Sequence, residues 1–234
     1  MNRKPYLVWF TGVAAVLVIV VALWMVVASF GFEPVGTEGL PGGFGGRVIA
    51  LEFVSSVGDV QKVLGPDVAA NTDVMRKVIS IDFVWIACYA LLFVLIGVML
   101  SRRNCPWAKY LAWIAIVSGL GAAVFDVREN MKILDLLSSL SITQEQVNAV
   151  RDATLAKWTL SFVSIAVLAI AFMELANKVA FWIATLFILT SLVGLFGLFN
   201  HRLLTLITIP LVIGLGLLSV TAFMWPEKLR EQRP

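Results

Sequence analysis

The sequence predicts an all-α integral membrane protein: a bundle of six transmembrane helices, both termini in the cytoplasm, and an extra amphipathic helix in the first outside loop. Three observations predict this class. The chain of 234 residues is 60% hydrophobic and only 14% charged, and its mean hydropathy is +0.92. A soluble domain has about 45–50% apolar and about 25% charged residues. In addition, six apolar runs approach or exceed the roughly 20 residues that a membrane helix needs.

The first apolar run occupies residues 6–30 and follows the basic residues Arg3 and Lys4. A basic start before an apolar run is also typical of a signal peptide, whose apolar region has about 7–15 residues. The run here is longer, so we interpret it as an uncleaved first transmembrane helix. Trp9 and Trp24 lie near its two ends, where aromatic residues commonly meet the membrane interface.

Residues 31–46 form a linker, because prolines and glycines throughout this stretch disfavour a stable helix. Residues 47–64 then show helical periodicity, with apolar side chains on one face and acidic Glu52 on the other. This second segment is too short and too polar to cross a membrane. We therefore predict a helix that lies on the outer membrane surface or packs over the mouth of the bundle.

Five further apolar runs are predicted to be spans: residues 78–100, 107–125, 155–173, 179–199 and 203–225. The third helix should continue as an amphipathic extension into the outside segment 126–152. Thr143 and Gln146 in this segment have the T-x-x-Q form of a capping box, which predicts the start of the helix that becomes the fourth span. Gly194 and Gly197 in the fifth span are expected to be points of close helix packing.

The distribution of lysine and arginine predicts which side of the membrane each loop occupies. Six spans place both termini on one side. Nine of the eighteen lysines and arginines lie in the short segments on that side, which are residues 1–5, 102–109, 174–178 and 226–234. The other nine are spread over much longer segments. Because basic residues concentrate in short cytoplasmic loops, we predict that both termini are in the cytoplasm.

Several kinds of site are excluded or disfavoured by composition. Cys88 and Cys105 are separated by roughly 25 Å of helix, so a disulfide within one chain is not expected. The single histidine, His201, excludes a bis-histidine haem within one chain and disfavours a histidine-rich zinc site. The formal net charge is only +3, and the basic residues fit topology signals better than a nucleic-acid-binding surface.

A polar layer is predicted near the outer ends of three consecutive spans. Asp82, Asp126 and Lys157 each lie about 26–28 Å of helix away from the cytoplasmic end of their span. The hydrocarbon layer is roughly 30 Å thick, so the three side chains should lie at nearly the same depth, just inside its outer boundary. Helices that follow one another in sequence usually pack together. We therefore predict a buried triad with one cation between two carboxylates.

Further polar residues surround this triad in the sequence. Asp126, Glu129 and Asn130 lie at i, i+3 and i+4, so they share one helix face. The candidate ligand-binding residues are Glu52, Asp82, Tyr89, Asp126, Glu129, Asn130 and Lys157. Two alternatives stay open. Glu129 and Asn130, and equally Asp82 and Asp126, could only cap their spans and face water, or the aspartates could form a purely structural ion pair with Lys157.

Short segments of the chain carry a resemblance to known proteins. They are Ala50-Leu51-Glu52-Phe53, Ile81-Asp82-Phe83 through Tyr89, Phe125-Asp126-Val127-Arg128-Glu129-Asn130, and Lys157-Trp158. Together they resemble a loose family of uncharacterised bacterial multi-pass membrane proteins with a D-x-x-E-N element at the outer end of a transmembrane helix. The resemblance covers residues 45–175. It implies a bacterial cytoplasmic (inner) membrane location and the importance of the polar layer, and it implies no chemistry.

Three classes of function fit these residues. The first is an outward-facing acidic pocket that binds or transports a cation, an amine or a polar lipid headgroup. The second is a structural or accessory subunit, in which the same residues lock helices while the lipid-facing surface joins a homo-oligomer or a larger membrane complex. The third is an enzyme that uses two carboxylates for acid–base chemistry or to bind a divalent cation. The sequence contains no P-loop, HExxH or Ser–His motif, so enzyme activity stays uncertain.

Overall fold

The computed structural model describes residues 6–30, 47–102, 106–175 and 177–229. Six of its helices are long and apolar enough to cross a membrane, and the described residues contain no strand. The predicted all-helical architecture with six candidate spans is therefore confirmed. The predicted linker 31–46 and the thiol of Cys105 lie outside the described residues.

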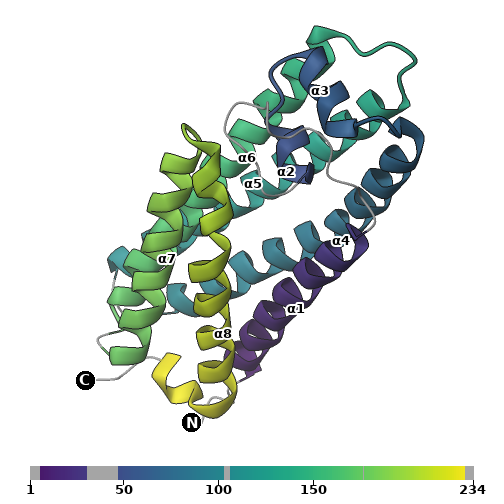
Figure 1. Ribbon diagram of the computed structural model, residues 1–234. Helices are drawn as coiled ribbons and strands as arrows, with labels where there is room; N and C mark the ends of the chain where they lie inside the picture. Colours follow the sequence, from purple (N-terminus) through teal and green to yellow (C-terminus); the bar gives the residue numbers. More distant parts are fainter. Residues whose placement is uncertain (1–5, 31–46, 103–105, 176, 230–234) are drawn as a thin grey trace.

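The helices follow the predicted order with shifted boundaries (Figure 1). They are α1 Tyr6–Ala28, α2 Arg47–Glu52, α3 Val57–Leu64, α4 Val68–Ser101, α5 Pro106–Ser138, α6 Gln144–Met173, α7 Lys178–Gly197 and α8 Thr208–Met224, with 3₁₀ helices η2 His201–Leu206 and η3 Pro226–Leu229. Helices α4, α5 and α6 all extend beyond the predicted spans at the same end of the bundle. The capping box is present, because Thr143 Oγ1 accepts from the Gln146 N–H and the Gln146 side chain accepts from the Thr143 N–H.

The predicted single helix over residues 47–64 is wrong, because the chain forms two short helices there. Ser56 has an extended backbone (φ −144°, ψ 160°), and its hydroxyl accepts a hydrogen bond from the Asp59 N–H as the N-cap of α3. Asp59 in turn accepts from both the N–H and the hydroxyl of Ser55. These local side-chain bonds compete with the helical ladder and break the helix after Glu52. Gly65, at φ 67°, ends α3.

The six long helices form a ring. Going around it, the packing neighbours are α1–α4–α5–α6–α7–α8, and α8 packs back against α1 (Figure 1). Helix α5 lies on the outside of the pair α4 and α6, which also touch each other. Helix η3 packs against α1, α7 and α8 at one end, while α2 and α3 lie at the opposite end over α6 and α4 (Figure 1).

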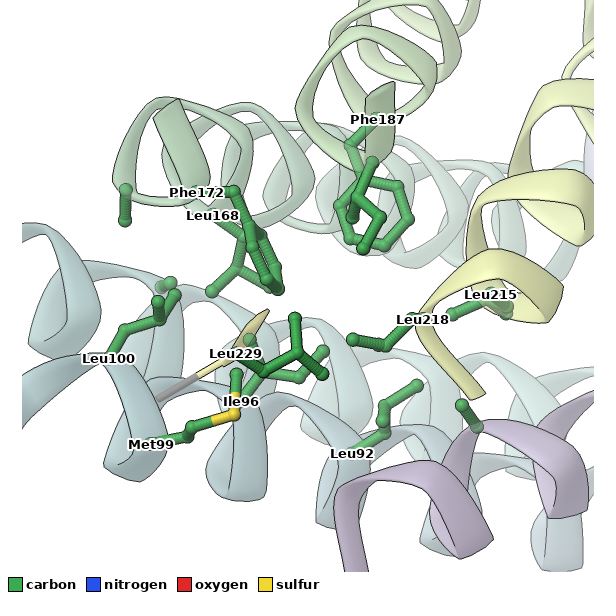
Figure 2. Close-up of a cluster of buried hydrophobic side chains, with 14 of the residues drawn as sticks. Leu92, Ile96, Met99, Leu100, Leu168, Phe172, Phe187, Leu215, Leu218 and Leu229 are labelled. Atoms are coloured by element: carbon green, nitrogen blue, oxygen red, sulfur yellow. The ribbon is translucent and has the colours of Figure 1, made fainter. Parts of the chain in front are cut away.

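Two apolar clusters hold this arrangement together. At the η3 end, leucine, isoleucine and phenylalanine side chains from α4, α6, α7 and α8 meet around Leu229 (Figure 2). At the other end, α2, α3 and the turn between them bury Leu51, Phe53 and Val60 against side chains of α4, α5 and α6 such as Ile133. Each fully buried side chain of this size contributes about 1.5–3 kcal/mol. The second cluster therefore fixes the position of the neighbouring Glu52 above α5 and α6.

The outer faces of the long helices are strongly apolar. Trp24, Trp113, Phe181 and Phe196 are each more than half exposed on the isolated chain. Apolar side chains on an outer surface are expected where that surface contacts lipid, because lipid tails do not penalise them as water does. The surface of the bundle therefore agrees with the composition of its helices.

Candidate functional site

Lys157 of α6 is the centre of a buried ionic cluster. Its Nζ atom lies 2.7 Å from Glu129 Oε2, 3.0 Å from Asp126 Oδ1 and 3.1 Å from Glu52 Oε1. Glu129 and Asp126 come from α5, and Glu52 comes from α2. A lysine ammonium has three N–H donors and no acceptor. Three carboxylates from two other helices therefore surround it, and it donates a hydrogen bond to Asp126 Oδ1.

Neighbouring polar side chains hold these carboxylates in place. The Tyr89 hydroxyl of α4 donates to Asp126 Oδ2 over 2.9 Å. The Trp158 indole N–H donates to Glu52 Oε2 over 3.0 Å. The Thr154 hydroxyl donates to the backbone carbonyl of Glu52, also over 3.0 Å. Helix α6 thus binds α2 through both the carboxylate and the backbone of Glu52.

Asp82 belongs to the same layer but has a different partner from the one predicted. Its Oδ2 accepts a hydrogen bond from Asn130 Nδ2 over 2.7 Å. The ion pairs of Lys157 within the described residues are with Glu52, Asp126 and Glu129. The predicted triad is therefore right for Asp126 and Lys157 and wrong for Asp82, because three other carboxylates lie within 3.1 Å of the ammonium.

The seven candidate residues are brought together in one closed cluster. Each is between 0% and 8% exposed, with Glu129 at 0% and Asn130 at 4%. The alternative in which Glu129 and Asn130 only cap the span and face water is therefore wrong. Their shared face with Asp126, predicted from the i, i+3, i+4 spacing, points into the bundle because α5 packs against both α4 and α6.

The cluster contains more acid than base. It has four carboxyl groups (Glu52, Asp82, Asp126 and Glu129) and one ammonium group (Lys157). With every group ionised its formal charge is 1 − 4 = −3. Uncompensated charge in a low-dielectric interior costs several kcal/mol for each ion. A buried cluster of this composition therefore favours protons on some of its carboxyl groups.

Glu129 is the least satisfied of these carboxyl groups. Its Oε1 is buried and has no hydrogen-bond partner among the described residues. Its Oε2 is close to the Lys157 ammonium at 2.7 Å, yet this contact does not have hydrogen-bond geometry. A buried carboxyl oxygen without a hydrogen-bond partner can still bind a proton or accept a hydrogen bond.

Glu52 is the one carboxyl group of the cluster that lies outside the six long helices. Burial raises the pKa of Glu52 above its ordinary value of 4.5, and the nearby Asp126 carboxylate raises it further. The Lys157 ammonium and the Trp158 hydrogen bond lower this pKa, but they do not cancel the rise. Glu52 therefore keeps its proton more readily in the folded chain than in water.

Three polar side chains of this region were not among the candidate site residues predicted from the sequence. Thr154 and Trp158 both bind Glu52, and helical spacing was the available signal, because Thr154 lies one turn before Lys157. Trp85 carries a buried indole N–H with no hydrogen-bond partner among the described residues. The described residues hold no group of three or more His, Cys, Asp or Glu arranged to bind a metal ion.

The comparisons with protein-family models, curated proteins and solved structures found no match to this chain. The resemblance to bacterial multi-pass proteins with a D-x-x-E-N element therefore stays a prediction. Function has to be inferred from the site itself, since a helical bundle alone does not specify one.

Proposed function

We propose that this chain is an integral membrane protein that binds and releases protons at the Lys157-centred carboxylate cluster and thereby transports protons across the membrane. The observation that carries the proposal is the imbalance of four buried carboxyl groups against one buried ammonium. Such a set changes its number of bound protons more readily than a balanced ion pair does, because each proton removes unfavourable buried charge.

The proton is the cation that best fits this cluster. Lys157 already lies among three carboxylates within 3.1 Å, where an external amine or a metal ion would have to replace it. A proton needs no additional volume. The unpaired Oε1 of Glu129 supports the same choice, since a proton there would neutralise a buried carboxyl group that no hydrogen-bond donor stabilises.

The proposed orientation in the membrane follows the charge distribution. Both termini are in the cytoplasm, and α2 and α3 cover the outer end of the bundle. Glu52 then stands between the outside and the remaining carboxyl groups, since it comes from α2 and contacts Lys157 directly. Protons would reach the cluster from the outer side through Glu52. The proposed location is the bacterial cytoplasmic membrane.

A structural or accessory subunit is the second candidate, and the closure of the cluster favours it. All seven candidate side chains are at most 8% exposed, and the ion pairs of Lys157 tie α2, α5 and α6 together. In that case the proton content of the cluster would stay constant, and the partner would be a second copy of the chain or a larger membrane complex.

Infrared difference spectroscopy on the protein in lipid distinguishes the two candidates, because it detects the C=O stretch of protonated carboxyl groups. We expect a band that changes with pH in the wild type and is lost or shifted in Glu129→Gln. Asp152→Asn is the control, because Asp152 is an exposed carboxylate on the same helix as Lys157. Proteoliposomes with an internal pH dye should then show proton uptake that Glu129→Gln abolishes. A titration-silent cluster, or no proton uptake, would overturn the proposal.

A further inference from the structure

Glu52 reaches the charged cluster from one short helix. It is the last residue of α2, and three side chains from one face of α6 hold it there. Thr154 donates to its backbone carbonyl over 3.0 Å, Trp158 donates to its carboxylate over 3.0 Å, and the Lys157 ammonium lies 3.1 Å from that carboxylate. Helix α2 is therefore fastened over the cluster chiefly by the end residue that carries the carboxyl group.

Helix α3 is held in place independently of α2. Beyond their contact with each other, the main packing partner of α2 is α6, and that of α3 is α4 (Figure 1). Asn71 of α4 donates a buried hydrogen bond of 2.6 Å to the backbone carbonyl of Leu64, the last residue of α3. Val60 of α3 is 0% exposed. Movement of α2 away from α6 therefore does not require movement of α3.

The connection between α2 and α3 has the structure of a hinge. Residues 53–56 are not helical, and the backbone of Ser56 is extended. Gln144 of α6 donates to the backbone carbonyl of Ser55 over 2.9 Å, which fixes the position of this connection. A few residues at the end of an element are sufficient to absorb the change in φ and ψ when that element swings. Helix α2 can therefore pivot here while the anchor of α3 stays intact.

The charges around Glu52 make its docked position depend on its proton. Asp126 and Glu129 of α5 share the Lys157 ammonium with it. Asp82 of α4 adds a fourth carboxyl group to the same layer. An ionised Glu52 adds buried charge that one ammonium does not balance, whereas a protonated Glu52 adds none. Burial accordingly holds the pKa of Glu52 above its ordinary value of 4.5.

The other titratable groups near α2 have different partners. Of the two acidic side chains that α2 and α3 carry, Asp59 pairs with Lys62 at 3.5 Å, and only Glu52 enters the cluster. On η2, the His201 ring packs against Phe53 with 4.5 Å between the ring centroids. The proton on Glu52 is therefore the one that acts directly on the contact between α2 and α6.

We propose that α2 (Arg47–Glu52) is a proton-operated lid over the cluster, docked when Glu52 is protonated and swung away from α6 about residues 53–56 when Glu52 is ionised. The inference rests on the proposed proton binding and release, because Glu52 has to gain and lose a proton in the folded chain. In the open position the Glu52 carboxylate takes up a proton from the outer side, and closure carries this proton to the cluster. The open form is the minor one, because it exposes Ala50 and Leu51, which are each 1% exposed in the docked position.

The reactivity of a cysteine under α2 towards a maleimide tests the lid on the full chain in detergent, in a Cys88→Ser, Cys105→Ser background. Ala50→Cys is the reporter. Leu140→Cys, at a fully exposed position, corrects each rate for the pH dependence of the thiol itself. We expect the corrected rate to rise several-fold as the pH is raised above 4.5 and then to level off, since opening is linked to the loss of one proton.

Two variants make this test specific for α2 and for Glu52. Val60→Cys on α3 should stay unreactive over the same pH range, and reactivity equal to that of Ala50→Cys would indicate general unfolding and contradict the lid. Glu52→Gln should make the Ala50→Cys rate independent of pH, because the amide does not ionise. A pH dependence that persists in Glu52→Gln would come from another group, such as His201, and would overturn the proposal.

A second reporter covers the case in which Ala50→Cys does not fold. Thr154 is 0% exposed beneath α2, so Thr154→Cys should show the same rise in corrected rate. A flat rate for the reporter, together with an infrared carboxyl band that changes with pH, would overturn the lid and leave proton binding by the cluster in place. A flat rate together with a band that does not change with pH would overturn both.

Discussion

The Lys157 ammonium and the Glu129 carboxylate lie 2.7 Å apart, and Glu129 is 0% exposed. Among the ion pairs that Lys157 makes with the described part of the chain this is the shortest, and it involves the carboxyl group with the poorest hydrogen bonding of the cluster. The ammonium is therefore what makes so many carboxyl groups tolerable in one buried place. Removing it should affect stability more than removing any one of its partners.

The first prediction concerns this dependence. Lys157→Met should destabilise the protein by about 3–5 kcal/mol, because it leaves buried carboxylates without a counter-ion. Adding Glu129→Gln or Asp126→Asn to Lys157→Met should recover part of the loss, since the stranded charge is reduced. Thermal unfolding in detergent measures both effects.

Lys62→Met provides the matched control for this cycle. Lys62 pairs with Asp59 at 3.5 Å, but its side chain is 52% exposed, so its loss should cost about 0–1 kcal/mol. If Lys157→Met behaved like Lys62→Met, and the double variants were additive, the cluster would not be an energetically coupled unit.

The second prediction concerns the pH dependence of stability through Glu52. Its folded-state pKa lies above the ordinary value of 4.5, because burial disfavours the ionised form more than Lys157 favours it. The contribution of Glu52 is therefore fully present below pH 4.5 and is lost as the pH rises through the folded-state pKa. Lys157, Asp126 and Glu129 face this group and contribute to the pH dependence as well. Glu52→Gln should therefore remove only the part of the stability loss at rising pH that Glu52 itself causes. The measurement is thermal unfolding across a pH series.

Asp59→Asn should have the opposite effect on the pH dependence of unfolding: it should reduce the loss of stability at falling pH. Burial raises the pKa of Asp59, but hydrogen bonds with Ser56 and Ser55 outweigh this and hold it below the ordinary value of 3.8. Its contribution is present above pH 3.8 and is lost as the pH falls through the folded-state pKa. Two variants with the same pH profile would contradict these assignments.

The third prediction concerns glycine at a point of close helix packing. A Cβ atom at Gly194 of α7 would collide with the ring of Phe162, which is 1% exposed and stacks on Trp158. Gly194→Ala should therefore cost about 1–3 kcal/mol through overpacking. Gly216→Ala is the control, since a Cβ there meets nothing within 4 Å and alanine favours a helix by up to about 1 kcal/mol. Equal unfolding temperatures for the two variants would contradict the packing of α6 on α7.

The fourth prediction tests orientation in the membrane with an impermeant maleimide. Cys105 lies in the loop 102–109, which we expect in the cytoplasm, so it should be protected in intact cells and react after lysis. Asn200→Cys in a Cys105→Ser background should react from outside. Helix α7 begins next to the predicted cytoplasmic segment 174–178, and Asn200 follows its other end. Labelling of Cys105 in intact cells would reverse the proposed topology.

The sequence predicted the candidate residues well where one helix carries them. Asp126, Glu129 and Asn130 share a face because the helical repeat is 3.6 residues, and that face is buried in the fold. The break between α2 and α3 was not predicted. Periodicity suggested one continuous helix over residues 47–64, whereas the side chains of Ser55, Ser56 and Asp59 bond locally and interrupt it.

The sequence by itself determined the membrane-like composition, the six apolar helices and the polar layer at one end of them, because these depend on hydropathy and on rise per residue. Only the tertiary structure decided which groups meet. Glu52 reaches Lys157 because α2 is held over α6 by the burial of its apolar neighbours, a contact far apart in the chain. Asp82 pairs with Asn130, whereas Glu52, Asp126 and Glu129 are the carboxylates that the fold brings within 3.1 Å of the Lys157 ammonium.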